Sequence, residues 1–204
     1  MPSNPDIIGA TSYSGLTAMQ VDNFKDVFEK FLKDIRPARI LEIGTSSGGL
    51  TMALNDIMMS LEIPYDIRTY DVNDQLWFWR LENDGIDVRI ENLFTPDYLN
   101  LDPEKIDDIR SFIQGPGTTV VMCDGGSKLN EFRLLSPLIK TGDFIMAHDY
   151  ALNPQFFEEN INGIIWNWLE IHGDQIADVC VDNNLQDYMK DEFQNIVWAC
   201  KVKR

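Results

Sequence analysis

Short apolar or β-branched runs alternate along this sequence with longer segments whose apolar residues recur at helical spacing. The run from Thr118 to Cys123 is the clearest example, because almost all of its side chains suit a strand that is buried on both faces. Such alternation is typical of an α/β protein, in which helices connect the parallel strands of an open sheet. The other strands predicted in the alternating region are 39–44, 66–71, 87–91 and 144–147, and the helices are 21–36, 50–61, 75–83, 102–115 and 129–135.

Both ends of the chain depart from this alternation. Residues 1–20 are rich in Ser, Gly, Pro and Thr and are predicted to form a loop. A long aromatic helix is predicted over 156–169. Two strands, 176–181 and 196–202, should follow with only a polar connector between them, and would pair as an antiparallel hairpin. We therefore expect residues 1–204 to form a single α/β domain around a doubly wound, mostly parallel seven-stranded sheet with a C-terminal antiparallel hairpin.

Composition limits the kind of partner. The 33 Asp and Glu residues outnumber the 17 Lys and Arg residues, and the formal net charge of −16 argues against a protein that binds nucleic-acid phosphates. No apolar run reaches the ~18 residues that a membrane span needs, and the N-terminal residues have no signal-peptide pattern. Cys123, Cys180 and Cys200 lack CxxC spacing and predict neither a disulfide framework nor a zinc site. We expect a cytoplasmic protein without nucleic-acid or membrane partners. Its aromatic clusters suit either the core or a dimer surface, so a homo-oligomer stays an alternative.

Polar residues follow the predicted parallel strands at the point where each strand ends. Ligands of open α/β sheets bind at the carboxyl ends of the strands, so we expect these residues to line one site. After the first strand, glycines allow a tight turn and close approach of a ligand to the backbone. Asp71 ends the second strand, where a carboxylate can accept both hydroxyls of a ribose. The full set comprises Glu42, the turn Gly44-Thr45-Ser46-Ser47-Gly48-Gly49, Asp71, Glu91, Asn92, Asp124, Gly125, Gly126, His148 and Asp149.

The glycine turn differs from that of dinucleotide-binding proteins. Its pattern is Glu-x-Gly-x-x-x-Gly rather than Gly-x-Gly-x-x-Gly, and the carboxylate of Glu42 would repel a phosphate. A nicotinamide-dependent oxidoreductase is therefore disfavoured. The turn suits a cationic or zwitterionic ligand with an ammonium group, such as the methionine part of S-adenosylmethionine.

These motifs resemble those of a known superfamily. Residues 40–48, Ile-Leu-Glu-Ile-Gly-Thr-Ser-Ser-Gly, resemble the first motif of class I S-adenosylmethionine-dependent methyltransferases, and residues 135–142 resemble the segment that leads into their fifth strand. Within that superfamily the chain is similar to the cephalosporin hydroxylase and rhamnosyl O-methyltransferase group, through residues 15–20, the turn at 42–49, and Asp124 followed by His148-Asp149. The resemblance covers about residues 15–204. It implies a Rossmann-like methyltransferase fold and S-adenosylmethionine as cofactor.

The resemblance also implies roles for single residues. Glu42 would bind the methionine amino group through water, Asp71 would bind the ribose, and Asn92 falls where the adenine edge is read. The residues expected to contact the cofactor are Glu42, Gly44, Thr45, Ser46, Gly48, Gly49, Asp71, Asn92 and Asp124.

Asp124, His148 and Asp149 lie where metal-dependent O-methyltransferases carry metal ligands. A divalent ion there, Mg²⁺ or Mn²⁺, would bind the substrate hydroxyl and lower its pKa. His148 departs from the all-oxygen pattern of those relatives, and an imidazole favours Mn²⁺, Fe²⁺ or Zn²⁺ over Mg²⁺. His148 and Asp149 are also consecutive, so both can bind one ion only if the backbone leaves strand geometry. The alternative is that His148 is a general base without a metal, with Lys128 as a further candidate base.

Taken together, the sequence predicts an S-adenosylmethionine-dependent methyltransferase of EC 2.1.1 type that methylates a hydroxyl on a small molecule or sugar with the help of a metal. The expected catalytic residues are His148, Asp124 and Lys128, and the expected metal ligands are Asp124, His148 and Asp149. Residues 8–20 and the segments after Asp149 should shape the acceptor pocket. Two alternatives stay open, a metal-independent methyltransferase with His148 as base and a non-catalytic binding protein on the same fold.

Overall fold

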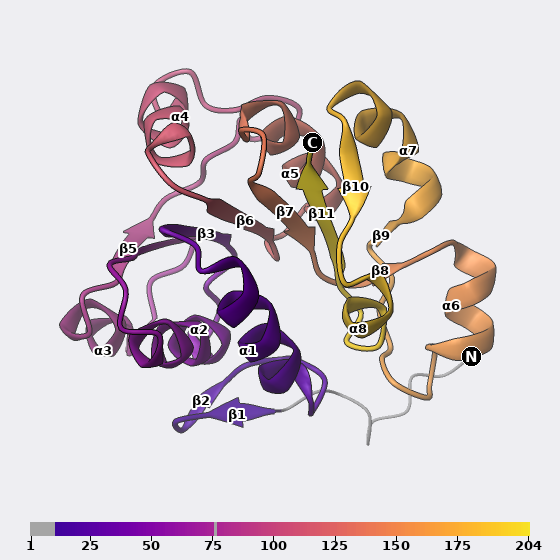
Figure 1. Ribbon diagram of the computed structural model, residues 1–204, viewed down its shortest axis with the longest axis horizontal. Helices are drawn as coiled ribbons and strands as arrows, with labels where there is room; N and C mark the ends of the chain where they lie inside the picture. Colours follow the sequence, from indigo (N-terminus) through magenta and orange to yellow (C-terminus); the bar gives the residue numbers. More distant parts are fainter. Residues whose placement is uncertain (1–10, 76) are drawn as a thin grey trace.

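A seven-stranded sheet forms the centre of the computed structural model, which describes residues 11–75 and 77–204 (Figure 1). The strand order is β10-β11-β7-β6-β3-β4-β5. The five strands from β7 to β5 are parallel, and β11 and β10 pair antiparallel at the other edge, so the predicted doubly wound sheet is confirmed. The strands are β3 (Arg39–Ile43), β4 (Asp66–Asp71), β5 (Asp87–Ile90), β6 (Thr119–Cys123), β7 (Phe144–Ala147), β10 (Leu185–Asp187) and β11 (Ala199–Lys203).

Helices cover both faces of the sheet because the central strands are apolar on both sides. On β6, Val120 packs in one apolar cluster with residues of α1, α2, α3 and α8, and Val121 packs in the other with residues of α4, α5 and α7. No helix in the described ranges is long and apolar enough to cross a membrane. The helices are α1 (Phe24–Ile35), α2 (Gly49–Ser60), α3 (Phe78–Asn83), α4 (Ile106–Gln114), α5 (Lys128–Leu135), η2 (Ser136–Leu138), α6 (Pro154–Asn160), α7 (Gly173–Asp182) and α8 (Lys190–Gln194).

The C-terminal hairpin has other bounds than the sequence predicted. Residues 176–181 belong to helix α7 and not to a strand, and the hairpin pairs β10 with β11 across the short helix α8. Within α7, Ile176 and Val179 are buried three residues apart, whereas Val181 is 79% exposed, which is helical spacing. Short apolar runs with β-branched residues do not distinguish a helix from a strand, and here the packing against the sheet decides.

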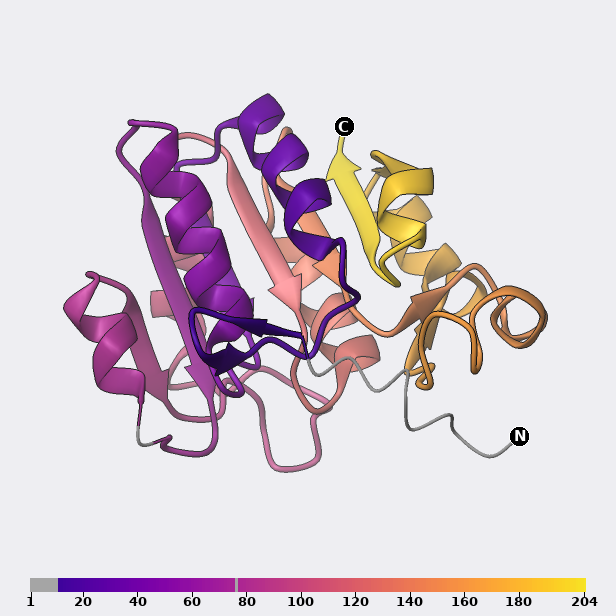
Figure 2. The same cartoon turned by 90° about the horizontal axis from the view of Figure 1, so that it is seen from below.

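The predicted helix over 156–169 is correct only for its first residues, 156–160. Helix α6 begins at Pro154, where the Asn153 side chain accepts a hydrogen bond from the Phe156 N–H, and it ends at Asn160. The chain then turns through Gly163, whose φ is +70°, and reaches β9 (Ile171–His172), which pairs with β8 (Tyr150–Ala151) in a small parallel sheet. Trp166 and Trp168 therefore lie on the loop between α6 and β9, while Phe156 and Phe157 stay in α6. Figure 2 shows this segment beside the main sheet.

Part of the predicted N-terminal loop is a hairpin. Strands β1 (Ser12–Tyr13) and β2 (Leu16–Thr17) pair antiparallel, and β2 lies directly on the start of α2. A Cβ at Gly49 would come within 2.6 Å of the Thr17 carbonyl, so glycine at this position lets the hairpin approach. Residues 1–10 of the predicted loop, and Leu76 of the predicted helix 75–83, lie outside the described residues.

Glu42 is fully buried in the middle of the sheet. Its Oε2 accepts hydrogen bonds of 2.6 Å from the hydroxyls of Thr51 and Thr69, while its Oε1 finds no donor in the described part of the chain. Burial raises the pKa of Glu42 to about 7, against the hydrogen bonds from the two threonines, which lower it. In the folded protein this carboxyl group is therefore only partly ionised at neutral pH, whereas an ordinary glutamate is fully ionised.

We expect Glu42 to make the stability of the protein depend on pH. Because its pKa is higher in the folded state than the usual ~4.3, the folded state binds a proton that the unfolded state releases, and stability falls as pH rises through this window. Between about pH 5.5 and about pH 8, the free energy of unfolding of the wild type should fall by about 2 kcal/mol more than that of Glu42→Gln. Urea unfolding of both proteins at both pH values measures this difference. Glu131, whose pKa is also raised, is present in both proteins, so its contribution cancels in the comparison. An equal fall in the two proteins would contradict the assignment.

Candidate functional site

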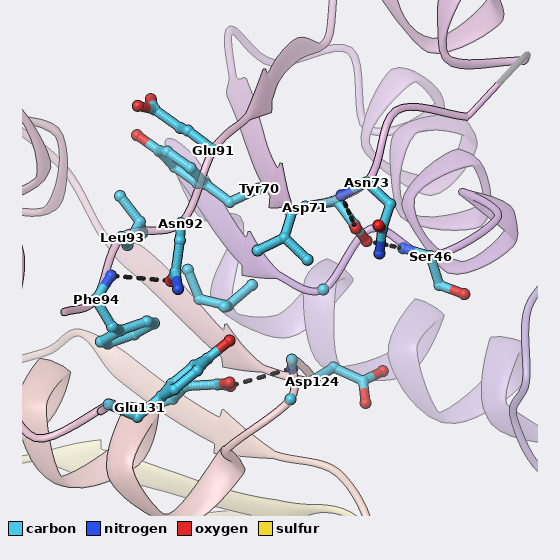
Figure 3. Close-up of a pocket in the computed structure, with 16 residues that line it drawn as sticks. Ser46, Tyr70, Asp71, Asn73, Glu91, Asn92, Leu93, Phe94, Asp124 and Glu131 are labelled. Atoms are coloured by element: carbon cyan, nitrogen blue, oxygen red, sulfur yellow. Dashed lines mark hydrogen bonds between the residues drawn. The ribbon is translucent and has the colours of Figure 1, made fainter. Parts of the chain in front are cut away.

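Two cavities open at the carboxyl edge of the parallel strands. The first, of about 260 Å³, lies at the ends of β3, β4, β5 and β6 (Figure 3). The second, of about 340 Å³, lies at the ends of β3, β6 and β7 and is also lined by Trp166, Trp168 and Glu170 from the loop after α6. Gly44, Ser46 and Asp124 line both cavities, so the two spaces adjoin at the turns that follow β3 and β6.

The turn after β3 can approach the turn after β6 because residue 44 has no side chain. Gly44 has a φ of +92°, and a Cβ there would lie 2.2 Å from the carbonyl oxygen of Asp124. A main-chain hydrogen bond extends the pairing of β3 and β6 up to this contact, since the Asp124 N–H donates to the Ile43 carbonyl at 2.9 Å. Any larger residue at position 44 would separate the two turns.

Asp71 is held at the rim of the first cavity. Its Oδ2 accepts from the Ser46 N–H and its Oδ1 from the Asn73 N–H, both at 2.8 Å (Figure 3). Across the cavity, the Asn92 side chain accepts from the Phe94 N–H at 3.0 Å, and the Phe94 ring stacks on Tyr98. The first cavity therefore has a fixed carboxylate on one wall and aromatic rings on another.

Six of the nine predicted cofactor residues line a cavity, and three do not. Gly44, Ser46, Asp71, Asn92 and Asp124 line the first cavity, and Gly44, Thr45, Ser46 and Asp124 line the second. Glu42, Gly48 and Gly49 line neither, since Glu42 is buried below the turn and both glycines lie at the start of α2. Their contribution is to shape the turn. The sequence did not single out the cavity residues Tyr70, Phe94, Tyr98 and Glu131, which carry no pattern beyond their position after a strand or in a helix.

Asp124, His148 and Asp149 come together at the second cavity, as the sequence predicted. His148 Nδ1 lies 3.0 Å from Asp124 Oδ1 and 3.7 Å from Asp149 Oδ1. Asp149 has a left-handed backbone with φ of +54°, so its side chain does not point away from that of His148 as it would on a strand. His148 and Asp149 are buried, and Asp124 is the partly exposed member of the group.

Side chains from distant parts of the chain hold this group in place. Gln20, which precedes α1, donates to Asp124 Oδ2 at 3.3 Å and accepts from the Trp198 indole N–H at 2.8 Å. Trp198 also stacks on the His148 ring, with centroids 4.9 Å apart. The Trp166 indole N–H donates to Asp149 Oδ1. Gln20 belongs to residues 15–20, which resemble the family, but the sequence pattern did not predict its contacts with Asp124 and Trp198.

Lys128, at the first position of α5, is the other charged member of the cluster. Its ammonium lies 2.9 Å from Asp149 Oδ2, 3.0 Å from Glu170 Oε2 and 3.6 Å from Asp124 Oδ1. Burial alone would lower the pKa of Lys128, but these carboxylates outweigh it and the pKa is raised. The ammonium is therefore a stable cation and poorly suited to accept a proton.

Neighbouring charges also shift the pKa values of His148 and Asp149. Burial lowers the pKa of His148, but Asp124 and Asp149 outweigh it, and the pKa is raised. Burial raises the pKa of Asp149, but His148 and Lys128 outweigh it, and the pKa is lowered. The neighbouring carboxylates thus make His148 a stronger base than a free imidazole, and the neighbouring cations make Asp149 a stronger acid, although both side chains are buried.

A divalent metal does not fit this donor set as it lies. Ligand atoms of Asp124, His148 and Asp149 are within 4.8 Å of one another, which is close enough for one ion. However, the Lys128 ammonium already contacts both carboxylates, and the third donor is an imidazole, which Mg²⁺ does not favour. Metal binding by these three residues stays a prediction.

Comparisons with known proteins match the sequence and the fold independently. The family model described as Rhamnosyl O-methyltransferase/CmcI matches residues 7–198. Among curated proteins, the rhamnosyl O-methyltransferase of Mycobacterium tuberculosis is 22% identical over 147 residues, which cover 70% of this chain and 58% of that protein. That of Mycobacterium leprae is 21% identical over 145 residues, which cover 70% and 62%. The match thus spans about three fifths of the length of these relatives.

Solved structures share the fold at low sequence identity. An apo structure of CmcI superposes with a TM-score of 0.67 at 14% identity, covering 96% of this chain and 77% of that one. A CmcI structure with Mg and SAM has a TM-score of 0.64 at 15% identity, covering 95% and 77%. A Staphylococcus aureus protein described as a caffeoyl-CoA O-methyltransferase has a TM-score of 0.56 at 14% identity, covering 88% and 82%. With the family model matching almost the whole chain, this protein belongs to the Rhamnosyl O-methyltransferase/CmcI family.

Proposed function

We propose that the protein is an S-adenosylmethionine-dependent methyltransferase that transfers the methyl group to a hydroxyl of a small molecule or sugar. The observation that carries the proposal is that two cavities meet at Asp124, one with the fixed carboxylate of Asp71 and one with the hydrogen-bonded pair of Asp124 and His148. A methyl donor and an acceptor bound in the two cavities would face each other across this residue. Relatives named rhamnosyl O-methyltransferase and a CmcI structure with Mg and SAM support the proposal.

The first cavity suits the nucleoside part of the cofactor. Each oxygen of Asp71 already accepts one main-chain N–H and has lone pairs left for the two ribose hydroxyls. Leu93, Phe94 and Tyr98 provide an apolar wall against which the adenine could stack. From there the methionine part would cross the bare backbone of Gly44, and its sulfonium would approach the carboxylate of Asp124.

The second cavity suits the acceptor. Ala18 and Met19 line it from the N-terminal segment, and Trp168 and Glu170 from the loop after α6, so segments from both ends of the chain shape the pocket. Trp168 is 38% exposed, and its ring could lie against the apolar face of a sugar or another ring. The carboxylate of Glu170 could accept hydrogen bonds from its hydroxyls.

The chemistry requires an acceptor oxygen that attacks the methyl carbon while the carbon–sulfur bond breaks. The sulfur keeps the electron pair of that bond, the cofactor leaves as neutral S-adenosylhomocysteine, and the hydroxyl proton must go to the protein. The hydrogen-bonded pair of Asp124 and His148 is suited to take it, since Asp124 reaches the cavity and His148 backs it at 3.0 Å. Positioning of the two reactants supplies the rest of the rate enhancement.

Metal-assisted transfer, which the sequence analysis favoured, is the second candidate. It is supported by the proximity of the ligand atoms of Asp124, His148 and Asp149. It would require the Lys128 ammonium to withdraw from both carboxylates.

The cofactor assignment makes Asp71 essential for binding. Asp71→Ala should weaken S-adenosylmethionine binding by about 10- to 100-fold, as expected for the loss of hydrogen bonds to a charged group. Isothermal titration calorimetry measures the change, with Asp107→Ala on the exposed first turn of α4 as a control that removes the same charge. The wild type should give no heat with NAD. Equal affinity of wild type and Asp71→Ala for S-adenosylmethionine would refute the assignment.

The proton-accepting pair makes His148 essential for turnover but not for cofactor binding. His148→Asn should lower the rate of S-adenosylhomocysteine formation by about 100-fold or more, within the usual contribution of a general base, and leave cofactor affinity nearly unchanged. The assay uses a panel of sugars and phenols and continues with the acceptor that the wild type turns over fastest. The matched control is His172→Asn, since His172 caps helix α7 and lines neither cavity. Full turnover by His148→Asn would exclude this role, and no turnover by the wild type with any hydroxylated acceptor would count against the proposed function.

A further inference from the structure

The Lys128 ammonium is enclosed by oxygen atoms. Three of them lie within hydrogen-bond distance, namely Asp149 Oδ2 at 2.9 Å, Glu170 Oε2 at 3.0 Å and the Gly125 carbonyl at 3.1 Å. Asp124 Oδ1 follows at 3.6 Å. An ammonium has three N–H donors, so these three acceptors satisfy it completely.

The backbone that carries Lys128 is fixed by a buried carboxylate. Glu131, one turn further along α5, accepts from the Ser127 N–H at 2.9 Å and from the Gly125 N–H at 3.1 Å. A Cβ at Gly125 would come within 2.4 Å of Glu131 Oε1, so a larger residue there would displace the Glu131 carboxylate from this turn. The lysine side chain is only 7% exposed, and it therefore lies in a preformed place and is not a mobile surface charge.

The oxygen atoms around the ammonium are of the kind that a divalent cation binds. Two are carboxylates that follow β6 and β7, Asp124 and Asp149, and they belong to the same group of residues whose ligand atoms could hold one ion. A third is a main-chain carbonyl, which is also a common ligand of hard cations. In the structure, the cation that these oxygen atoms surround is the ammonium group of Lys128.

We propose that Lys128 is a built-in cation that takes the place of a divalent metal between Asp124 and Asp149, so that the protein works without one. This inference rests on the proposed function for its catalytic part. The ammonium keeps its proton throughout and donates a hydrogen bond to the acceptor oxygen as negative charge develops there. Glu170, at 44% exposed the most accessible of its partners, is the one that an acceptor oxygen would replace.

Manganese binding tests the proposal without any turnover. Electron paramagnetic resonance of Mn²⁺ titrated into the full-length protein reports the bound fraction. The wild type and the surface control Lys33→Met should show no saturable site up to about 1 mM, the weak end of protein sites for hard cations. Lys128→Met should gain one site at least about tenfold tighter, because it leaves the Asp124 and Asp149 carboxylates without their cation beside the His148 imidazole. A saturable wild-type site as tight as that of Lys128→Met, or no site in a folded Lys128→Met, would overturn the proposal.

Activity after dialysis against EDTA provides a second, separate readout. The wild type should keep its rate, Lys128→Met should lose at least about tenfold, and added Mn²⁺ should restore part of the rate in that variant alone. Lys128→Arg keeps the charge and should bind no Mn²⁺. If Lys128→Met does not fold, a wild type that loses its activity in EDTA and regains it with Mn²⁺ still overturns the proposal. If the wild type forms no S-adenosylhomocysteine at all, the proposed function fails, whereas the Mn²⁺ titration still decides the role of Lys128.

Discussion

The contact between the turns after β3 and β6 determines the geometry of the candidate site. A Cβ at position 44 would lie 2.2 Å from the Asp124 carbonyl oxygen, so only glycine allows the two turns to touch. This contact joins the turn that leads into α2 to the turn that leads into α5, and Asp124 lines both cavities.

Electrostatics then determine what the second cavity can do. Asp124 and Asp149 are largely removed from water, and charges in such a place are retained only when they are paired. Lys128 and His148 provide the pairing, and Glu170 connects the cluster to the cavity surface. The acidic excess of the chain is therefore partly a property of the site, where it suits a cationic sulfonium ligand, while most of the excess lies on ordinary solvated faces.

The sequence predicted the sheet and the meeting of its strand ends, because parallel strands place their carboxyl ends at one edge. Asp124 and Asp149 were found in this way, although the left-handed backbone that turns Asp149 inward is set by tertiary structure. Helix α7 over 176–181 was missed, since a short apolar run fits either period and only packing decides. The contact of Gln20 with Asp124 and the burial of Lys128 were also out of reach, because they depend on residues up to about a hundred positions apart.

A crystal structure of the protein grown with S-adenosylhomocysteine and Mn²⁺, with anomalous data at the manganese edge, tests the central claim most directly. The account predicts the ribose on Asp71, the sulfur beside Asp124, and the Lys128 ammonium between the Asp124 and Asp149 carboxylates, with no anomalous peak there. A sulfur atom far from Asp124 would contradict the joining of donor and acceptor at this residue. A manganese peak between the two carboxylates, with Lys128 displaced, would contradict the built-in cation.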